Sequence, residues 1–467
     1  MDVSKSNLLI KWLICFALAA LCFMLPLGPA YTFLCQKFTA STVFCIALLA
    51  FDLLNPLMIG LLLPALWVLF GCATFNQALS GWSGSFLFML LGAFTFTNTL
   101  NRCGVLKRVG YKIILLCGGT LNGAIWGLFL SSIVLDAASF TMGQALPITL
   151  ALAVYYSLEL KPKDPESMLV VLALILGATQ ANAYLYSPIS ISLIQSGIAG
   201  VLPEYKVSAA ELIVHNLPVF LFSVLLLWGF MKAIGKKSTR VLNIDNQRAY
   251  FKNELAKMGP VSLIEKKALI VLALMVAFML LSPVHGLDMS FGFFFAALAM
   301  FLPFINAGKL EDVTSLGNML PIISITFAFM SIGAVGTACG FGAVISSAVT
   351  PFMSQFGAVG SVYAVLLLAT LSNFILTPAA MLVLLSAPVA QFCMDLGYNF
   401  MPHINAIYLA EHAVFHPYEW PSYMTIFAFG MLQINDFVKV CVVKAIFYLL
   451  FISAIMIPLW YFVGWIA

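Results

Sequence analysis

Long runs of apolar residues recur from one end of the chain to the other and constrain its fold more than any other feature. Each run contains about 20 residues, which lets a helix cross a hydrocarbon layer of roughly 30 Å. The 467-residue chain is 63% hydrophobic and only 9% charged, whereas an ordinary soluble domain is about half apolar and a quarter charged. The sequence therefore predicts an all-α polytopic membrane protein and argues against a soluble enzyme, a disordered regulator or a disulfide scaffold.

Eleven of these runs have the form of membrane-spanning helices. Two further stretches, 113–157 and 341–396, each contain two apolar arms separated by short polar or small residues. This pattern predicts a re-entrant hairpin, because non-helical backbone at membrane depth is tolerated only where protein or a wet cavity covers it. The predicted spans are 8–27, 40–54, 56–75, 83–101, 168–200, 210–232, 268–283, 289–307, 318–338, 402–435 and 440–466.

The distribution of basic residues supports this count. Segment 232–267 holds nine of the 22 lysines and arginines, while the expected outer loops hold few. Basic residues concentrate on the cytoplasmic side of membrane proteins, and eleven spans with two hairpins keep the basic clusters on one side. Counting either hairpin as a single crossing would move basic clusters outside. We therefore expect a multi-pass protein of the cell inner membrane with a cytoplasmic N-terminus.

The chain also contains two halves that resemble each other weakly. Ser187-Pro188 and His416-Pro417 interrupt long apolar spans at equivalent places. Because the halves start on opposite sides of the membrane, this pattern predicts an inverted repeat, in which paired broken helices indicate a transporter's midplane site. The expected organisation is a first half 1–231 (scaffold spans 8–112, hairpin 113–157, broken helix 168–200), a cytoplasmic basic linker 232–267, and a second half 268–467 (hairpin 341–396, broken helix 402–435).

Four places combine polar side chains with a helix break, namely the two hairpin tips and the two broken helices. Unwound backbone exposes carbonyl oxygens that coordinate a cation such as sodium, and half-helix N-termini attract an anion. We expect substrate contacts from Ser139, Ser187, Pro188, Ser190, Thr377, Pro378, His416, Pro417 and Glu419. We expect ion coupling from Asp136, Ala137, Thr141, Thr179, Asn182, Ser372, Asn373, Glu411 and His412.

Structural roles remain open for many of these residues. An isolated Ser or Thr in a membrane helix more often bonds back to its own helix. His412 and His416 are candidate proton carriers or pH sensors, with a hydrogen-bonded packing role as the alternative. Asp136 and Glu419 are stronger candidates, because an ionisable side chain at membrane depth is costly and functional by default.

Two stretches resemble the divalent anion/sodium symporter family, part of the ion transporter superfamily. FLFMLLGAFTFTNTLNRCGVLKRVG (86–110) is similar to that family's fourth span and the amphipathic segment after it, and HPYEWPSYMTIFAFGMLQINDFVK (416–439) to its last broken helix. The order of elements agrees over nearly the whole chain. The resemblance implies a homodimer in which a transport domain of hairpins and broken helices moves as an elevator against a fixed scaffold. It also implies transport of C4-dicarboxylates, citrate or sulfate with sodium.

The hairpin tips depart from the family pattern of Ser-Asn-Thr, which contacts sodium and the substrate carboxylate. The first tip reads Ala137, Ala138, Ser139 and the second reads Leu376, Thr377, Pro378. At the second break, Glu419 stands where the family pattern has asparagine and adds a negative charge beside an anion site. Either a protonated Glu419 makes protons the coupling ion, or the substrate carries less negative charge or is a cation.

These features favour a secondary active transporter of small anions, such as di- or tricarboxylates or sulfate, driven by sodium or protons. The alternative is a sodium/proton exchanger, or a carrier of another ion, on the same scaffold. A membrane enzyme acting on lipid is disfavoured, because it should carry clusters of His, Asp or Glu at the membrane surface, whereas the polar residues here sit mid-span. The sequence also lacks a phosphate-binding loop, a zinc helix and a nucleophile elbow. We expect no cofactor beyond the coupling ion, no nucleic-acid partner and ten cysteines as free thiols.

Overall fold

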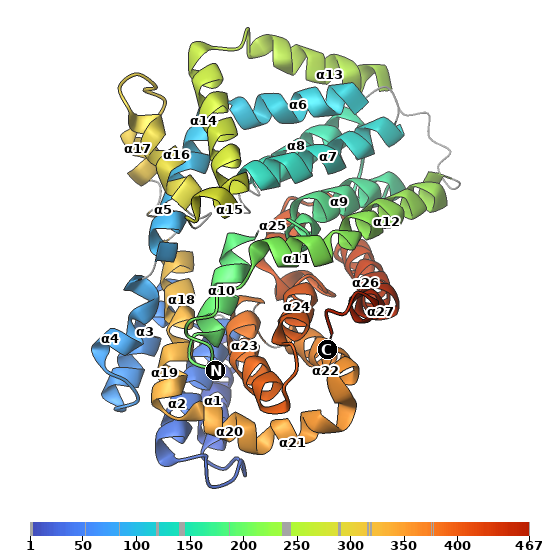
Figure 1. The fold of residues 1–467 in the computed structure, drawn as a ribbon. Coiled ribbons are helices and arrows are strands. Elements are labelled where there is room, and N and C mark those ends of the chain that lie inside the picture. Colours follow the sequence, from blue (N-terminus) through green and yellow to red (C-terminus); the bar gives the residue numbers. More distant parts are fainter. Residues whose placement is uncertain are drawn as a thin grey trace.

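The described part of the chain consists of helices joined by turns and loops, as the ribbon in Figure 1 shows. The computed structural model describes residues 3–51, 53–83, 85–117, 121–139, 145–185, 187–235, 244–287, 291–314, 317, 320–374, 376 and 378–466. All regular structure within these ranges is helical, so the predicted all-α membrane fold is confirmed. The ten cysteines are free.

The helices up to residue 235 cover the expected first half. Several begin at sequence signals for a helix N-terminus, such as Thr32, which caps α2, and the prolines at the start of α3, α9 and α10. They are α1 (Val3–Cys22), α2 (Phe33–Ala50), α3 (Pro56–Leu69), α4 (Phe75–Ala78), η1 (Ser80–Ser83), α5 (Ser85–Arg102), α6 (Val105–Cys117), α7 (Leu121–Ser139), α8 (Ala145–Ser157), α9 (Pro165–Ala178), η2 (Gln180–Ala183), α10 (Pro188–Ile198), α11 (Ala209–Asn216) and α12 (Pro218–Gly235).

The helices after residue 243 include part of the basic linker and the expected second half. A capping box of Ser262 and Glu265 begins α14. They are α13 (Ile244–Lys257), α14 (Leu263–Leu280), α15 (Ser282–His285), α16 (Phe291–Phe301), α17 (Leu310–Thr314), α18 (Leu320–Met330), α19 (Ile332–Ala338), α20 (Phe341–Ala348), α21 (Thr350–Met353), η4 (Ser354–Phe356), α22 (Gly357–Ser372), α23 (Pro378–Leu396), α24 (Phe400–Ala410), η5 (Pro417–Glu419), α25 (Pro421–Ala428), α26 (Ile434–Phe451), η6 (Ile452–Met456) and α27 (Ile457–Phe462).

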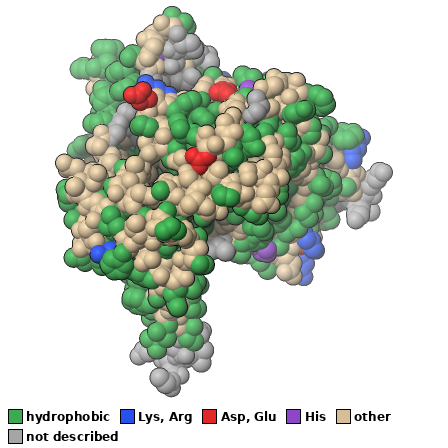
Figure 2. All heavy atoms as spheres, turned by 60° about the horizontal axis from the view of Figure 1, so that its bottom comes forward, with side chains coloured by type: hydrophobic (Ala, Val, Ile, Leu, Met, Phe, Trp, Pro, Cys, Tyr) green, Lys and Arg blue, Asp and Glu red, His purple; other side chains and the backbone are tan. Residues whose placement is uncertain are grey.

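Apolar side chains cover much of the outer surface as well as the core. Figure 2 shows one face on which hydrophobic side chains are abundant and charged ones are few and scattered. Large apolar residues such as Leu69, Leu116 and Phe462 are strongly exposed, which suits contact with lipid. Helical stretches long and apolar enough to cross a membrane include Phe33–Ala50, Leu121–Ala138, Pro165–Ile198, Ala209–Ile234, Phe341–Ser372 and Ile434–Phe462.

Both predicted hairpins begin later than the sequence indicated. The arms of the first are α7 and α8, because residues 113–117 belong to α6. The arms of the second are α22 and α23, because residues 341–356 form α20, α21 and η4. Gly357, at a φ of 66°, begins α22, and this conformation favours glycine. The helix α7 is by itself long enough to span a membrane, and so is the stretch Phe341–Ser372 that ends with α22. The re-entrant paths of both hairpins therefore stay predictions.

Each hairpin packs closely against the first broken helix. Gly177 of α9 lies so close to α7 that a side chain would not fit there, since an added Cβ atom would be 2.6 Å from the carbonyl oxygen of Phe129. A Cβ at Gly197 of α10 would lie 2.8 Å from the carbonyl oxygen of Val383 in α23. In Figure 1, α7 and α8 lie near the top and α22 and α23 in the lower part, with α9, α24 and α25 between them.

The expected basic linker is partly structured, because α13 packs against α6 and α8. Arg108 of α6 forms a buried ion pair with Glu265 at the start of α14, with 3.0 Å between Nε and Oε2. The same guanidinium donates hydrogen bonds to the carbonyls of Gly259 at 2.9 Å and Met258 at 3.2 Å. The end of the linker is therefore fastened to the first half of the chain.

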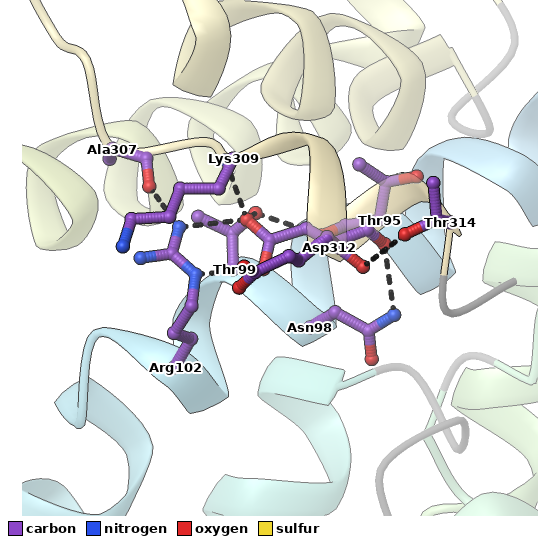
Figure 3. A network of polar contacts seen from close by, with 9 residues as sticks. Thr95, Asn98, Thr99, Arg102, Ala307, Lys309, Asp312 and Thr314 are labelled. Carbon is purple, nitrogen blue, oxygen red and sulfur yellow. Dashed lines mark hydrogen bonds and ion pairs between the residues drawn. The ribbon is translucent and has the colours of Figure 1, made fainter.

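A second polar network joins the end of α5 to the segment around α17 (Figure 3). The Asp312 carboxylate accepts hydrogen bonds from Thr99 at 2.9 Å, from Arg102 at 2.8 and 2.9 Å, and from the backbone amide of Lys309 at 2.9 Å. Arg102 also donates to the carbonyl of Ala307. Burial alone would raise the pKa of Asp312, but these hydrogen bonds outweigh it and lower that pKa.

Candidate substrate and ion site

The first long span is interrupted between α9 and α10. α9 ends at Ala178, η2 follows, and α10 starts at Pro188 with Ser187 as its N-cap residue. Proline suits this first helical position, where its missing amide hydrogen has no intrahelical partner. The interruption carries a set of buried, uncharged polar side chains, namely Thr179, Gln180, Asn182, Ser187 and Ser190.

The second long span is interrupted between α24 and α25. α24 ends at Ala410 and α25 begins at Pro421, with η5 between them. The buried Glu419 carboxylate accepts hydrogen bonds from the backbone amides of Phe415 at 3.0 Å and His416 at 2.9 Å. The ring Nδ1 of His416 lies 3.3 Å from the same carboxylate. Glu419 therefore caps its own turn.

The two interruptions contact each other directly. The Ser190 hydroxyl donates a hydrogen bond of 3.3 Å to the Glu411 carboxylate. The Thr179 hydroxyl donates a hydrogen bond of 2.8 Å back to the carbonyl of Ile175 and lies 3.4 Å from the Tyr423 hydroxyl. The Tyr408 hydroxyl donates to the backbone carbonyl of Asn182. We call the buried residues at this junction the polar centre: Thr179, Gln180, Asn182, Ser187, Ser190, Tyr408, Glu411, His412, Tyr423, Lys444 and Tyr448.

Lys444 was not among the site residues predicted from the sequence, although a usable signal was present. Lys444 is completely buried in α26. Its ammonium group donates to the backbone carbonyl of His412 at 2.5 Å and to the Tyr423 hydroxyl at 3.0 Å. Lys444 is a lone charge within the apolar run 440–466, so the argument that singled out Asp136 applies equally to it.

Several polar atoms of the polar centre have no hydrogen-bond partner among the described residues. They include both ring nitrogens of His412, Oδ1 of Asn182 and Oε2 of Glu411. Neither the oxygen nor the nitrogen of the Gln180 side-chain amide has a hydrogen-bond partner among the described residues, although the Tyr448 hydroxyl lies beside it. An unsatisfied buried polar group costs about 1–3 kcal/mol. These atoms are therefore candidate contacts for a solute or ion.

The second hairpin tip contacts the second break. The Asn373 side chain donates a hydrogen bond of 2.6 Å to the carbonyl of Ala410, at the end of α24. The Phe374 and Phe415 rings stack with their centroids 5.2 Å apart. The Ser372 hydroxyl bonds back to the carbonyl of Leu368 in its own helix at 2.8 Å, so this contact is structural. Pro378, buried, begins α23, and Thr377 lies outside the described residues.

The first hairpin tip is described only in part. Asp136 is completely buried in the last turns of α7 and interacts electrostatically with Tyr184 beside the first break. Ala137 follows it in the helix and is exposed, and Ser139 ends α7. The Ser139 side chain and Thr141 lie outside the described residues.

A cavity of about 420 Å³ lies elsewhere, between α2, α10, α19, α20 and α23. Its lining is mainly apolar, with glycines and the polar residues Thr39, Thr42, Thr337 and Gln391. It shares no residue with the polar centre. Within the described part of the chain, no group of three or more His, Cys, Asp or Glu is arranged to hold a metal ion.

Comparison with known proteins identifies the family. A family model described as "Citrate transporter" matches residues 46–410, more than three quarters of the chain. No curated protein matches the sequence. The fold is similar to the crystal structure of the Alcanivorax borkumensis YdaH transporter, described as having an unusual topology, with a TM-score of 0.57 and 14% identity over 81% of this chain and 85% of that one. The expected place in the ion transporter superfamily is confirmed, and the chain belongs to the citrate transporter family, as a multi-pass membrane transporter and not an enzyme.

Proposed function

We propose that this protein is a secondary active transporter that carries citrate, or another small di- or tricarboxylate, across the cell inner membrane, coupled to sodium or protons. The family to which the chain belongs supports citrate as the first substrate to test. The distribution of basic residues supports a cytoplasmic N-terminus.

The direct contact between the two broken helices is the observation that carries this proposal. It brings together a buried lysine, a buried carboxylate, and amide and imidazole groups that lack a hydrogen-bond partner among the described residues. The positive charge of Lys444 and the N-terminal end of α10 favour an anion, while the hydroxyl and amide groups of the first break supply hydrogen bonds. Ser187, Pro188, Ser190 and the second tip are our proposed substrate contacts, and Asp136, Glu411 and His412 our proposed ion-coupling groups.

We further propose that the hairpins and broken helices move together as the transport domain of a homodimeric elevator. The close approaches at Gly177 and Gly197 support this, because helices whose backbones are in direct contact move as one rigid unit. Such a domain would carry the polar centre from one side of the membrane to the other.

The decisive test is uptake by purified protein in proteoliposomes. Labelled citrate, succinate, sulfate and acetate are each offered under an imposed sodium gradient or an imposed proton gradient. Citrate accumulation driven by one of the gradients is the expected result. Gradient-driven sodium or proton flux without any organic anion would instead favour the exchanger, and no accumulation of any solute would contradict the proposal.

A further inference from the structure

We propose that the ammonium group of Lys444 is a built-in cation at the second break and takes the place of a bound metal cation there. This inference deepens the proposed function of coupled anion transport and rests on it. In this role, the positive charge at the second break comes from the Lys444 side chain and not from a bound ion.

The first argument is the kind of atoms around the ammonium group. Its nitrogen lies 2.5 Å from the backbone carbonyl oxygen of His412 and 3.0 Å from the hydroxyl oxygen of Tyr423. Carbonyl and other neutral oxygens are also ligands for hard metal cations. In transporters with broken helices, unwound carbonyls and the C-terminal ends of half-helices coordinate the coupling cation. The ammonium of Lys444 therefore lies among the type of groups that bind a cation.

The second argument is the position of these oxygens in the fold. His412 lies just beyond the C-terminal end of α24, and Tyr423 lies in the first turn of α25. The C-terminal end of a helix carries a partial negative charge, which the ammonium group balances. Lys444 thus contacts both sides of the second break from α26, as a cation bound in that break would.

The third argument is that no direct ion pair neutralises this charge. Across the described ranges, no carboxylate oxygen lies within 4.0 Å of the Lys444 nitrogen. The neighbouring titratable groups are Glu419 and Cys441, which act on it electrostatically, His412, and the rings of Tyr423 and Tyr448, each with its centroid 5.6 Å from the nitrogen. A buried charge without a paired carboxylate is costly, and its net positive field favours an anion nearby.

The experiment removes the ammonium group and asks whether sodium replaces it. Lys444→Ala and Lys444→Gln are purified in detergent, and the midpoint of thermal unfolding is measured in sodium chloride and in choline chloride at equal ionic strength. We expect both variants to be less stable than the wild type in choline and to regain about 2–4 °C in sodium. The wild type should gain less from sodium than either variant.

A matched control comes from the same helix. Lys439 is exposed and pairs with Asp436 at 2.9 Å, so Lys439→Ala removes a lysine of α26 without touching the second break. Its response to sodium should equal that of the wild type. Adding Tyr423→Phe to Lys444→Ala removes one of the two oxygens and should abolish the sodium response.

Two outcomes would overturn the inference. One is an equal response to sodium in the wild type and the Lys444 variants. The other is failure of both variants to fold in either salt, since sodium would then have failed to replace the ammonium group. These measurements need no substrate, so a failure of citrate uptake in proteoliposomes would count against the proposed function and leave this result separate.

Discussion

The two breaks differ in the side chains that they bring into the membrane. The first break carries only uncharged groups, such as Thr179, Gln180 and Asn182. The second carries Glu411, His412, His416 and Glu419, and contacts the ammonium of Lys444. The predicted inverted repeat places the two breaks at equivalent positions, yet the breaks present different chemistry. We infer that the first break serves mainly hydrogen bonding to a solute and the second mainly the control of charge.

The carboxylates of the second break also differ from each other. Glu419 has three hydrogen-bonding groups within its own turn, whereas Glu411 reaches across to Ser190 and leaves Oε2 without a partner among the described residues. The contact across the junction makes Glu411 the carboxylate that links the two breaks. The variants below test this division of roles.

Replacing Glu411 should have the largest effect on transport. In Glu411→Leu, the junction loses its only described side-chain hydrogen bond to a carboxylate, and such bonds contribute about 1.5–3 kcal/mol. We expect the initial rate of citrate uptake to fall about a hundredfold. Glu254→Gln, on α13 and bonded to the exposed Lys257 at 2.7 Å, is the control and should transport normally. A Glu411→Leu rate within twofold of the wild type would remove Glu411 from the mechanism.

Replacing Gln180 should separate transport from stability. Gln180→Leu removes a buried amide whose atoms complete no hydrogen bond with described residues, so we expect the midpoint of thermal unfolding to hold or rise. Citrate uptake should nevertheless fall about tenfold, as expected for a lost contact of about 1.4 kcal/mol. The matched control is Gln391→Leu, since Gln391 bonds to Asp395 at 2.9 Å. It should lose stability and keep transport, and the same pattern in Gln180→Leu would contradict a binding role.

Replacing Glu419 should have a smaller effect than the sequence indicated. Glu419→Gln keeps one oxygen that accepts from the turn, so we expect a loss of about 1 kcal/mol in stability, typical of a weakened cap, and an uptake rate reduced about fivefold or less. The dependence of uptake on pH should be retained. Complete loss of transport, or a flat profile between pH 5 and 8, would restore Glu419 as the proton carrier.

Replacing Asp312 should affect stability and leave transport at the breaks unchanged. Because hydrogen bonds lower the pKa of Asp312, its carboxylate stabilises the fold above its ordinary pKa, and this contribution is lost as the pH falls through the lowered value. Asp312→Asn should therefore unfold about 2–4 °C below the wild type at neutral pH, with the gap closing in acid. A pH-independent gap would show that the charge of Asp312 contributes nothing.

Much of this fold follows from the sequence, because hydrophobic length and proline position are local properties. The apolar runs of the sequence correspond to helices, and Pro188 and Pro417 lie in interruptions of long spans. The start of each hairpin was misplaced, because the residues that separate it from the preceding helix are small or uncharged and hold no charge to mark a boundary. Examples are Gly118, Gly119 and Thr120 before α7, and Ser354 and Gln355 before α22.

The side-chain geometry of the site was harder to predict. The direction of the Glu419 carboxylate depends on the turn that it caps, and a turn of this kind is invisible in residue spacing. Tyr423 and Tyr408 join the polar centre only because two segments far apart in the chain cross there. Lys444 is a different case, because the sequence itself shows a single charged residue within the apolar run 440–466, and this position could have been predicted as part of the site.

The ion pairs of Arg108 and Arg102 hold together segments that are far apart in the chain. Arg108 binds Glu265 at the end of the basic linker, and Arg102 binds Asp312 in the second half, so each ties a helix of the first half to a segment that follows residue 243. We therefore expect the parts before and after residues 236–243 to stay associated through the two ion pairs, without a covalent link between residues 235 and 244. Two separately translated fragments, 1–235 and 244–467, should therefore assemble in one cell into a working carrier, because both ion pairs form between the fragments.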